Sequence, residues 1–327
     1  MNILIIKAKA KLPVVDYGGT ERVIWYLAKE LGEMGHNVTL LVAPGSSCPF
    51  ARVIEYRDDL PIEKQVPKDI DIIHFQEHAD EALAGVPHVV TVHGNVCRGT
   101  MDANSIFVSR DHARRFGSDS YVYNGMDWDD YGPVDFDRER RYYHFLGKAA
   151  WKVKNVRGAI DIVKAIPGAH LKVLGGHRFN FKMGIRFTFS PKVSFEGMVG
   201  GDRKLSLLGG SRGLIFPVLW DEPFGLAITE SLYFGAPVFG TPYGSLPELV
   251  DKEVGFLTDS HSEMVAHLMG DSHYSPRVCH EYAADNFNSR IMAERYVEKY
   301  ERVLNGHALN GDTLHPNDYY KRYTWNS

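Results

Sequence analysis

The first part of the chain alternates between buried-strand and helix patterns, and this alternation constrains the fold more than any other feature. Residues 2–6 are apolar and partly β-branched, which predicts a strand, and residues 38–42 (VTLLV) predict a second one. Between them, apolar residues recur at helical spacing from Val23 to Leu31, and Gly35 follows as a stop signal. A strand, a helix and a strand in this order form a βαβ unit, which requires a parallel sheet.

The same rhythm continues along the chain. Further strands are predicted at residues 71–75, 88–92, 105–108, 121–123, 142–147, 171–174, 193–195, 213–217 and 237–240. Helices are predicted near residues 155–166, 202–209, 224–234 and 289–304. Charged residues crowd residues 126–141, which read as an interdomain linker. We therefore expect an α/β protein with two Rossmann-like, doubly wound domains at 1–133 and 134–288, followed by a helix and tail at 289–327.

Composition and charge narrow the classes of function. A net charge of -4 over 327 residues gives no basic excess for nucleic-acid binding. Cys48, Cys97 and Cys279 lie far apart, in neither a disulfide framework nor a metal-ligand spacing. The acidic pair Asp69 and Asp71 leads into a buried strand, so no metal site is expected there. Without a signal-peptide or membrane-span pattern we expect a cytoplasmic protein, and a peripheral membrane contact stays open.

A glycine pair lies between the first strand and the first helix. Gly18 and Gly19 let the backbone approach a ligand, and the following helix start offers N–H groups to an anion. The alternative is a plain tight turn with Thr20 as the helix N-cap. The spacing is not GxGxxG, so a nicotinamide dehydrogenase is disfavoured.

Two lysines follow the first strand of the second half. Lys148 and Lys154 lie near the two ends of the segment KAAWKVKN (residues 148–155), and Lys152 lies between them. Ammonium groups in a strand-to-helix loop suit a diphosphate, and the alternative is a solvated loop face.

The segment 222–230 (EPFGLAITE) is the most informative stretch. Glu222 precedes a helix start at which Phe224, Gly225 and Leu226 would leave backbone N–H groups without intrahelical partners. Glu230 lies about one and a half turns further along, roughly the reach from a phosphate to a ribose. One element could therefore offer carboxylates to a sugar and to a ribose, with donors for phosphates between them. The alternative is that Glu222 only favours the helix dipole and that Glu230 is a surface residue.

Histidines complete the set of candidates. His93 (TVHG) follows a predicted strand, where it could serve as a base or a hydrogen-bond donor, although a structural histidine is as common there. His74 (IIHF) is flanked by apolar strand residues, which favours a structural role. Asn124 and Gly125 read as a turn.

Taken in order, these segments resemble the retaining glycosyltransferase family 4 of the GT-B fold. The resemblance covers most of the chain: YGGTERVIWYLAKELGEMGHNVTLLV, DIIHFQ, TVHG, YNGMD, FLGKAAWKVKN, LKVLGG, VSFEGMV and EVGFL. Its most specific part is IFPVLWDEPFGLAITESLYFGAPVFGTPYGSLPELV, which carries the E-x7-E pattern of Glu222 and Glu230. It implies two domains, the first on the acceptor side and the second on the donor side, with residues 289–304 crossing back to the first.

The resemblance implies roles for the second-domain candidates. Glu222 contacts the transferred sugar, and Glu230 holds the nucleotide ribose. Lys148 and Lys154 bind the diphosphate. Backbone donors at residues 224–226 serve the sugar and the diphosphate.

It also implies roles for the first domain. Gly18 and Gly19 close on the donor phosphates or the acceptor, and His93 lies by the donor sugar.

Three positions depart from the family pattern. Lys148 stands where Arg is usual and loses the bidentate fork, Lys154-Asn155 replaces Lys-Gly, and Ser231-Leu232 replaces Ala-Met, which we interpret as a packing change.

The predicted function is a retaining, metal-independent transfer of a sugar from a UDP- or GDP-sugar to a glycan, lipid or small-molecule acceptor, with no cofactor. Catalysis is assigned to Glu222, His93, Lys148 and Lys154, by front-face displacement with the diphosphate leaving. Two alternatives remain: a GT-B epimerase or phosphorylase, and a non-catalytic nucleotide-sugar-binding subunit. The donor, the acceptor, the linkage and the oligomeric state stay open.

Overall fold

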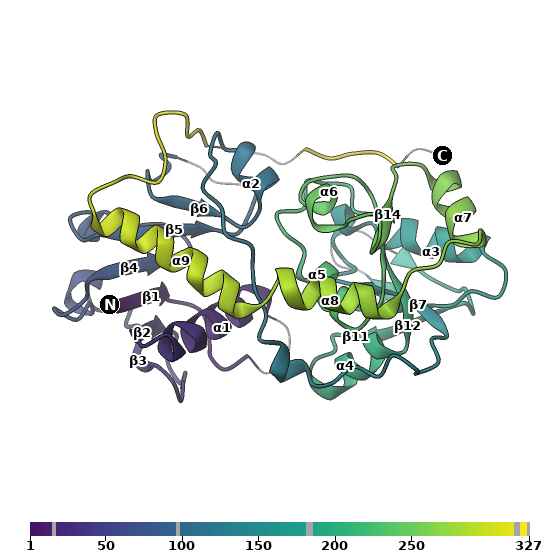
Figure 1. Cartoon of the computed structure of the whole chain (residues 1–327), viewed down its shortest axis with the longest axis horizontal. Coiled ribbons are helices and arrows are strands. Elements are labelled where there is room, and N and C mark those ends of the chain that lie inside the picture. Colours follow the sequence, from purple (N-terminus) through teal and green to yellow (C-terminus); the bar gives the residue numbers. More distant parts are fainter. Residues whose placement is uncertain (15–17, 96–98, 181–185, 317–320, 326–327) are drawn as a thin grey trace. The chain divides into compact units, whose positions relative to one another are not determined.

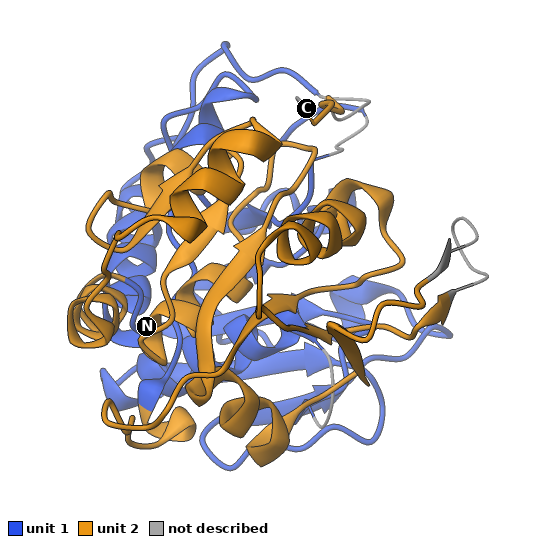
Figure 2. Ribbon diagram, turned by 90° about the vertical axis from the view of Figure 1, so that its right-hand side faces the viewer, with its two compact units in different colours: residues 1–14, 18–128, 287–319 blue, residues 15–17, 129–286, 320–327 orange. Residues whose placement is uncertain are grey.

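The computed structural model describes the chain except for residues 15–17, 96–98, 181–185, 317–320 and 326–327 (Figure 1). It divides into two compact units, shown in different colours in Figure 2. Of the described residues, unit 1 contains 1–14, 18–95, 99–128 and 287–316, and unit 2 contains 129–180, 186–286 and 321–325.

Unit 1 is built on a six-stranded sheet with the order β3-β2-β1-β4-β5-β6. Its strands are β1 (Asn2–Lys7), β2 (Asn37–Val42), β3 (Arg52–Glu55), β4 (Ile72–Phe75), β5 (His88–Val92) and β6 (Ser105–Phe107). Every pairing in this sheet is parallel, as the βαβ pattern predicts. The central strands are buried on both faces, which explains their continuous apolar runs.

Helices cover the unit 1 sheet unevenly. They are α1 (Gly19–Glu33), α2 (Arg110–Arg114) and α9 (Ser289–Leu304), with short 3-10 turns at Ile62–Lys64 and Glu81–Leu83. Figure 1 shows α9 lying along β4 and β5, and it also packs against α1. Between β4 and β5 the connection forms only the 3-10 turn Glu81–Leu83, in place of an α-helix.

Unit 2 repeats the same topology. Its sheet has the order β11-β8-β7-β12-β13-β14, again with parallel pairings throughout. The strands are β7 (Tyr142–Leu146), β8 (Leu171–Leu174), β11 (Val193–Gly197), β12 (Ser211–Phe216), β13 (Val238–Gly240) and β14 (Gly255–Leu257). A separate antiparallel hairpin is formed by β9 (Phe179–Asn180) and β10 (Arg186–Phe187).

Helices pack on the unit 2 sheet. They are α3 (Val156–Ala165), α4 (Gly201–Gly209), α5 (Leu226–Tyr233), α6 (Leu246–Leu249), α7 (His261–Met269) and α8 (Pro276–Asn286), with 3-10 turns at Trp128–Tyr131 and Lys152–Lys154. Apolar residues of α3, β7 and β8 form the main core of this unit, and Met264 of α7 belongs to it.

The structure differs from the sequence prediction at several places. Residues 121–123 form no strand; Tyr121 makes only an isolated bridge to Phe107. The sequence does not predict the short strands β3 and β14, because neither has a long apolar run. The two compact units divide between Trp128 and Asp129, and the domain bounds of 133/134 stay a prediction. Among the described residues, no helix is long and apolar enough to cross a membrane.

Candidate active site

The carboxylate of Glu222 lies at the centre of a polar cluster in unit 2. Its Oε2 accepts a 2.6 Å hydrogen bond from Nζ of Lys154 and a 2.7 Å bond from Nε1 of Trp220. The residue is 5% exposed, so this charge is largely removed from water and depends on its two donors. No partner of Oε1 is found in the part of the chain that the structure describes, and this oxygen can accept a bond from a ligand.

The backbone of Glu222 is held by the loop that follows β13. Ser245 N donates to Glu222 O at 2.9 Å, and the Ser245 hydroxyl donates to Phe224 O at 2.7 Å. Gly244 approaches so closely that a Cβ there would lie 2.2 Å from Glu222 N, and its φ is 63°. Only glycine fits both the conformation and the approach.

The residues after Glu222 form the start of α5. Gly225 is the N-cap with φ 91°, a conformation that favours glycine. The first backbone bond of the helix runs from Ile228 N to Gly225 O at 2.9 Å. The amides of Gly225 and Leu226 precede this bond, at the place where the sequence predicts backbone donors for a ligand. Phe224 is buried and anchors the turn.

Glu230 is buried within α5, so its interpretation as a surface residue is wrong. It is 5% exposed, and its Oε1 accepts bonds from the hydroxyl of Tyr131, at 2.6 Å, and from Nζ of Lys204. Lys204 is itself 5% exposed and lies over the Tyr131 ring. Sequence reasoning missed both partners, because they come from the linker and from α4 and carry no local motif.

The three lysines of the loop after β7 have different environments. Lys154 is largely buried and lies over the rings of Trp220 and Phe216. Lys148 and Lys152 are exposed, and Lys148 lies over the ring of Trp151. The structure thus brings Lys154 to Glu222 and leaves Lys148 exposed beside Trp151.

Ser231, next to Glu230, has a structural role that explains its departure from the family pattern. Its hydroxyl donates to Ala227 O and lies 2.9 Å from Nε2 of His144 on β7. Both residues are fully buried, and burial lowers the pKa of His144 to about 3. The neutral imidazole therefore donates from Nε2 to Ser231 and fixes α5 on the sheet.

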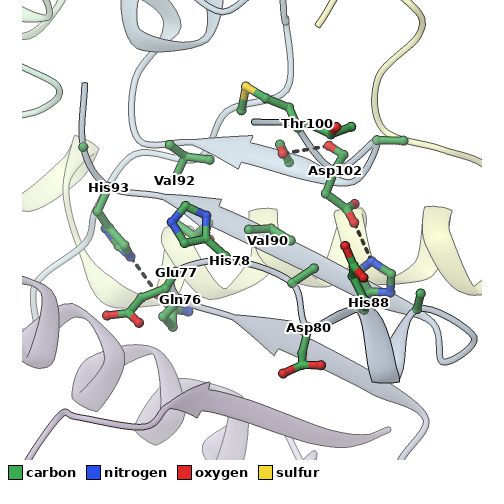
Figure 3. A pocket seen from close by; sticks show the side chains of 18 of the residues that line it. Gln76, Glu77, His78, Asp80, His88, Val90, Val92, His93, Thr100 and Asp102 are labelled. Atoms are coloured by element: carbon green, nitrogen blue, oxygen red, sulfur yellow. Dashed lines mark hydrogen bonds and ion pairs between the residues drawn. The ribbon is translucent and has the colours of Figure 1, made fainter. Parts of the chain in front are cut away.

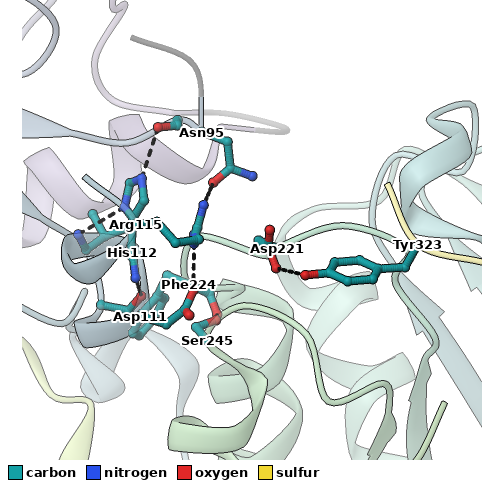
Figure 4. A network of polar contacts seen from close by, with 11 residues as sticks. Asn95, Asp111, His112, Arg115, Asp221, Phe224, Ser245 and Tyr323 are labelled. Atoms are coloured by element: carbon teal, nitrogen blue, oxygen red, sulfur yellow. Dashed lines mark hydrogen bonds and ion pairs between the residues drawn. The ribbon is translucent and has the colours of Figure 1, made fainter. Parts of the chain in front are cut away.

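The carboxy-terminal tail supports the same loop. Tyr323 N donates to Leu219 O at 3.0 Å, and the Tyr323 hydroxyl donates to Asp221 Oδ1 at 2.8 Å (Figure 4). The Tyr323 ring stacks on Tyr243, with centroids 3.7 Å apart. Asp221 directly precedes Glu222, so this tail positions the candidate carboxylate.

In unit 1, the glycine pair begins α1. Gly18 is the N-cap in extended conformation, and Gly19 is the first helical residue. Thr20 is therefore inside the helix, and its interpretation as the N-cap is wrong. A Cβ at Gly18 would meet Oε2 of Glu21 at 2.9 Å, so the carboxylate of Glu21 lies against this backbone.

His93 lies at the carboxyl end of β5, where it lines a cavity of about 780 Å³ within unit 1 (Figure 3). Its Nε2 is 2.8 Å from Oε1 of Gln76, which follows β4. His74 is fully buried, as its flanking residues predict.

Carboxylates outnumber ammonium groups in the lining of this cavity. Lys7 pairs with Glu77, and the imidazole of His88 binds Asp102 at 2.8 Å. Asp80 also lines the cavity (Figure 3). The lining therefore carries a net negative charge.

The acidic pair before β4 has a structural role. Asp71 Oδ2 accepts a bond from Asn2 N at 2.6 Å, and Asp69 O accepts one from the Asn2 side chain. Within the described residues, no group of three or more His, Cys, Asp or Glu is placed to hold a metal ion. Cys48 and Cys279 are free thiols, and Cys97 lies outside the described residues.

Comparison with known proteins shows which proteins have a similar sequence or fold. Residues 130–271 match the family model of glycosyl transferases group 1. No curated protein matches the sequence significantly. AviGT4, a glycosyltransferase involved in avilamycin A biosynthesis, is 23% identical with a TM-score of 0.76, over 93% of this chain and 98% of that one.

Two further structures share the fold. The sucrose-phosphate synthase of Thermosynechococcus elongatus is 16% identical with a TM-score of 0.68, over 93% of this chain and 99% of that one. HepE of Anabaena, in complex with UDP and glucose, is 16% identical with a TM-score of 0.66, over 92% of this chain and 99% of that one. The chain thus has the GT-B fold predicted from its sequence, and its residues 130–271 are similar to the glycosyl transferases of group 1.

Proposed function

We propose that the chain is a retaining, metal-independent glycosyltransferase of family 4, which moves a sugar from a nucleotide-diphosphate sugar to an acceptor hydroxyl. The observation that carries the proposal is the buried cluster of Glu222, Lys154 and Trp220 at the start of α5. A buried carboxylate with one bonded oxygen and one available oxygen, beside a helix start, can bind a sugar hydroxyl and a phosphate together.

The donor is assigned to unit 2. The amides of Gly225 and Leu226 at the helix start would bind the diphosphate, together with the ammonium group of Lys154, which is paired with Glu222. Lys148 is exposed and would close on the diphosphate when it binds. Glu230, further along α5, would accept hydrogen bonds from the ribose hydroxyls. The likeness to HepE, whose structure contains UDP and glucose, supports a nucleotide donor.

The reaction breaks the bond between the sugar anomeric carbon and the diphosphate oxygen, and forms a bond from that carbon to the acceptor oxygen. The acceptor proton passes to the departing phosphate oxygen on the same face of the sugar. Lys154, Lys148 and the helix N–H groups stabilise the negative charge that develops on the diphosphate. The two donors on Oε2 of Glu222 reduce its nucleophilicity, which favours this route over a covalent glycosyl-enzyme.

The acceptor is assigned to the cavity of unit 1. Its imidazoles, carboxylates and backbone can bind hydroxyl groups, and His93 is at its edge near the end of β5. Glu77 and Asp102 are paired with Lys7 and His88, so the excess negative charge comes from Asp80 and Glu81, and it disfavours a phosphate-bearing acceptor. A neutral glycan or a hydroxylated small molecule fits this lining better.

The first experiment is a thermal-shift screen of the full chain against UDP, GDP, ADP, CMP and TDP and their sugar conjugates, with and without EDTA. Ligands that bind the folded state raise the melting temperature. We expect a rise with one nucleotide family, of the same size in EDTA. A rise with NAD alone would overturn the function.

The competing activities have their own signatures. NMR of the product with the matching donor and a panel of neutral and phosphorylated sugars should show a retained anomeric configuration. An inverted product would contradict the mechanism. Sugar release only in the presence of phosphate indicates a phosphorylase, conversion of the donor without acceptor indicates an epimerase, and binding without turnover indicates a non-catalytic subunit.

A further inference from the structure

A buried hydrogen-bond chain connects His93 to the interior of unit 1. Oε1 of Gln76 is 2.8 Å from Nε2 of His93, and Nε2 of Gln76 is 2.9 Å from Nε2 of His74 (Figure 3 shows the first bond). Gln76 is 2% exposed and His74 is fully buried, so neither has water as an alternative partner. The amide is therefore held at both ends by imidazoles.

The chain continues to α9. Nδ1 of His74 is 2.7 Å from the hydroxyl of Tyr300, and Nε2 of His74 is 2.7 Å from the hydroxyl of Thr91. The hydroxyl of Tyr296 lies 3.0 Å from Thr91. Both tyrosines belong to α9 and are buried, so a helix distant in sequence fixes the orientation of His74.

The two ends of the amide determine which ring nitrogens carry protons. An amide oxygen only accepts, so His93 must donate from Nε2–H. An amide nitrogen only donates, so Nε2 of His74 must accept, and the His74 proton lies on Nδ1, from which it is donated to Tyr300. One glutamine thereby sets the tautomers of two histidines.

We propose that Gln76 is a positioning residue that holds His93 as the neutral Nε2–H tautomer, so that Nδ1 is an acceptor for a substrate hydroxyl. No hydrogen-bond partner of Nδ1 is found within the described residues, and the ring borders the cavity. This assigns His93 an accepting role, whereas the sequence left open a base, a hydrogen-bond donor or a structural histidine. The identification of this hydroxyl as part of a sugar rests on the proposed function. The tautomer of His93 does not depend on that function.

The surroundings keep the ring neutral. Burial lowers the pKa of His93 to about 3, and the nearby charge of Lys7 acts in the same direction. The other titratable groups around it are Glu77, which is paired with Lys7, His78 at the cavity, His74 on β4, and His112 on α2. A lowered pKa keeps the imidazole neutral at neutral pH and makes it a poorer base, which favours an accepting role over proton abstraction.

The direct test is histidine-selective ¹⁵N NMR of the full chain, with His93→Asn used to assign the ring signals. Two-bond correlations distinguish a protonated ring nitrogen from an unprotonated one. We expect His93 to have a protonated Nε2 and an unprotonated Nδ1, unchanged between about pH 6 and pH 8.5. A protonated Nδ1, or a ring that titrates in this interval, would overturn the proposal.

Gln76→Glu tests the positioning by changing the charge at the same place. A carboxylate that accepts from His93 should raise the pKa of its ring by about 1–3. The variant should therefore show a His93 titration below neutral pH that the wild type lacks, and kcat/KM should fall as the pH decreases through it. Gln76→Met removes both bonds and should lower kcat/KM roughly tenfold, with a mixture of His93 tautomers.

Gln65→Glu is the matched control. Gln65 is another buried glutamine of unit 1 with both ends of its amide bonded, to Arg57 and Leu60, and it has no imidazole partner among the described residues. It should leave the His93 signals and the pH profile unchanged. Equal pH profiles for Gln76→Glu and Gln65→Glu would reject the positioning role. Correct tautomers in a chain that transfers no sugar from any nucleotide donor would instead reject the proposed function.

Discussion

The ammonium group of Lys154 donates a 2.6 Å hydrogen bond to the carboxylate of Glu222, 68 positions further along the chain. Both side chains are largely buried, with 13% and 7% of their side-chain surface exposed. The carboxylate charge is therefore compensated mainly by Lys154 and by the indole N–H of Trp220.

Replacing either partner of this pair should abolish most activity. Lys154→Met and Glu222→Gln should each lower turnover by roughly 100-fold or more, because charge stabilisation at the diphosphate or contact with the sugar is lost. Lys154→Met should also cost about 3–5 kcal/mol of stability, since a buried carboxylate loses its cation. Denaturant unfolding of both single variants and the double variant measures the coupling. Near-normal turnover in a folded variant would reject the role of that residue.

The Glu230 cluster should control donor affinity. Lys204→Met removes the ammonium group from a buried carboxylate, and should cost about 3–5 kcal/mol in unfolding free energy. If Glu230 holds the ribose, KM for the nucleotide sugar should rise while kcat changes little. Tyr131→Phe is the milder variant, because it keeps the ring below Lys204 and loses one hydrogen bond, about 1 kcal/mol. Loss of stability with an unchanged KM would show that Glu230 is only structural.

Ser231→Ala should destabilise unit 2. The substitution leaves the buried Nε2–H of His144 without its 2.9 Å acceptor, which costs about 1–3 kcal/mol. The double variant Ser231→Ala with His144→Leu removes both partners, and should recover part of this loss. Urea unfolding of the two variants tests the pair; equal stability of Ser231→Ala and wild type would contradict the bond.

Gly244→Ala should disturb the site through the backbone. The new Cβ would clash with Glu222 N, and the residue would also be in the left-handed region. We expect a loss of more than about 2 kcal/mol and of most activity. Gly132→Ala is the control, because Gly132 has φ 69° but no described atom within 4 Å of the point that a Cβ would occupy. It should show only the conformational cost, so equal effects of the two variants would rule out the clash.

The His88–Asp102 pair should make stability depend on pH in a defined direction. The hydrogen bond from His88 to Asp102 raises the pKa of His88, so this contribution is complete below about pH 6.5 and is lost as the pH rises through the folded pKa. The pKa of Asp102 is lowered, although burial acts in the opposite direction, and that contribution is lost in acid. Asp102→Asn should therefore cost about 1.5 kcal/mol near pH 6 and less near pH 8.5. A constant difference, measured by thermal unfolding, would exclude the ion pair.

Much of the fold can be predicted from the sequence because parallel strands buried on both faces leave continuous apolar runs, as in β1, β2 and β12. Residues 121–123 show the limit of that signal. Apolar character predicts burial, and this predicted strand is buried in part, but Tyr121 pairs with Phe107 through a single bridge. Short edge strands such as β3 are defined by a neighbour, which local composition does not reveal.

The candidate site shows the same division. Glu222, Gly225 and Glu230 share one local segment, so their spacing could be predicted, whereas the partners that hold them come from elsewhere. Lys204 is 26 positions and Tyr131 is 99 positions from Glu230. Gln76 lies in a segment that the resemblance includes, but its role depends on α9, more than 200 residues later along the chain. Such contacts follow from tertiary packing and leave no periodic trace.

The way the chain passes between the units has a consequence for synthesis on the ribosome. Unit 1 begins at residue 1 but includes α9, whose tyrosines bind His74 and Thr91 in its sheet. Unit 2 is interrupted by that segment and is completed by the tail, where Tyr323 binds Asp221. The β-strands of the first unit thus emerge long before the helix that covers them. The sheet of unit 1 therefore stays incompletely packed while the strands of unit 2 are being translated. Unit 1 can finish packing only after α9 has been made, and unit 2 only after Tyr323 has been made.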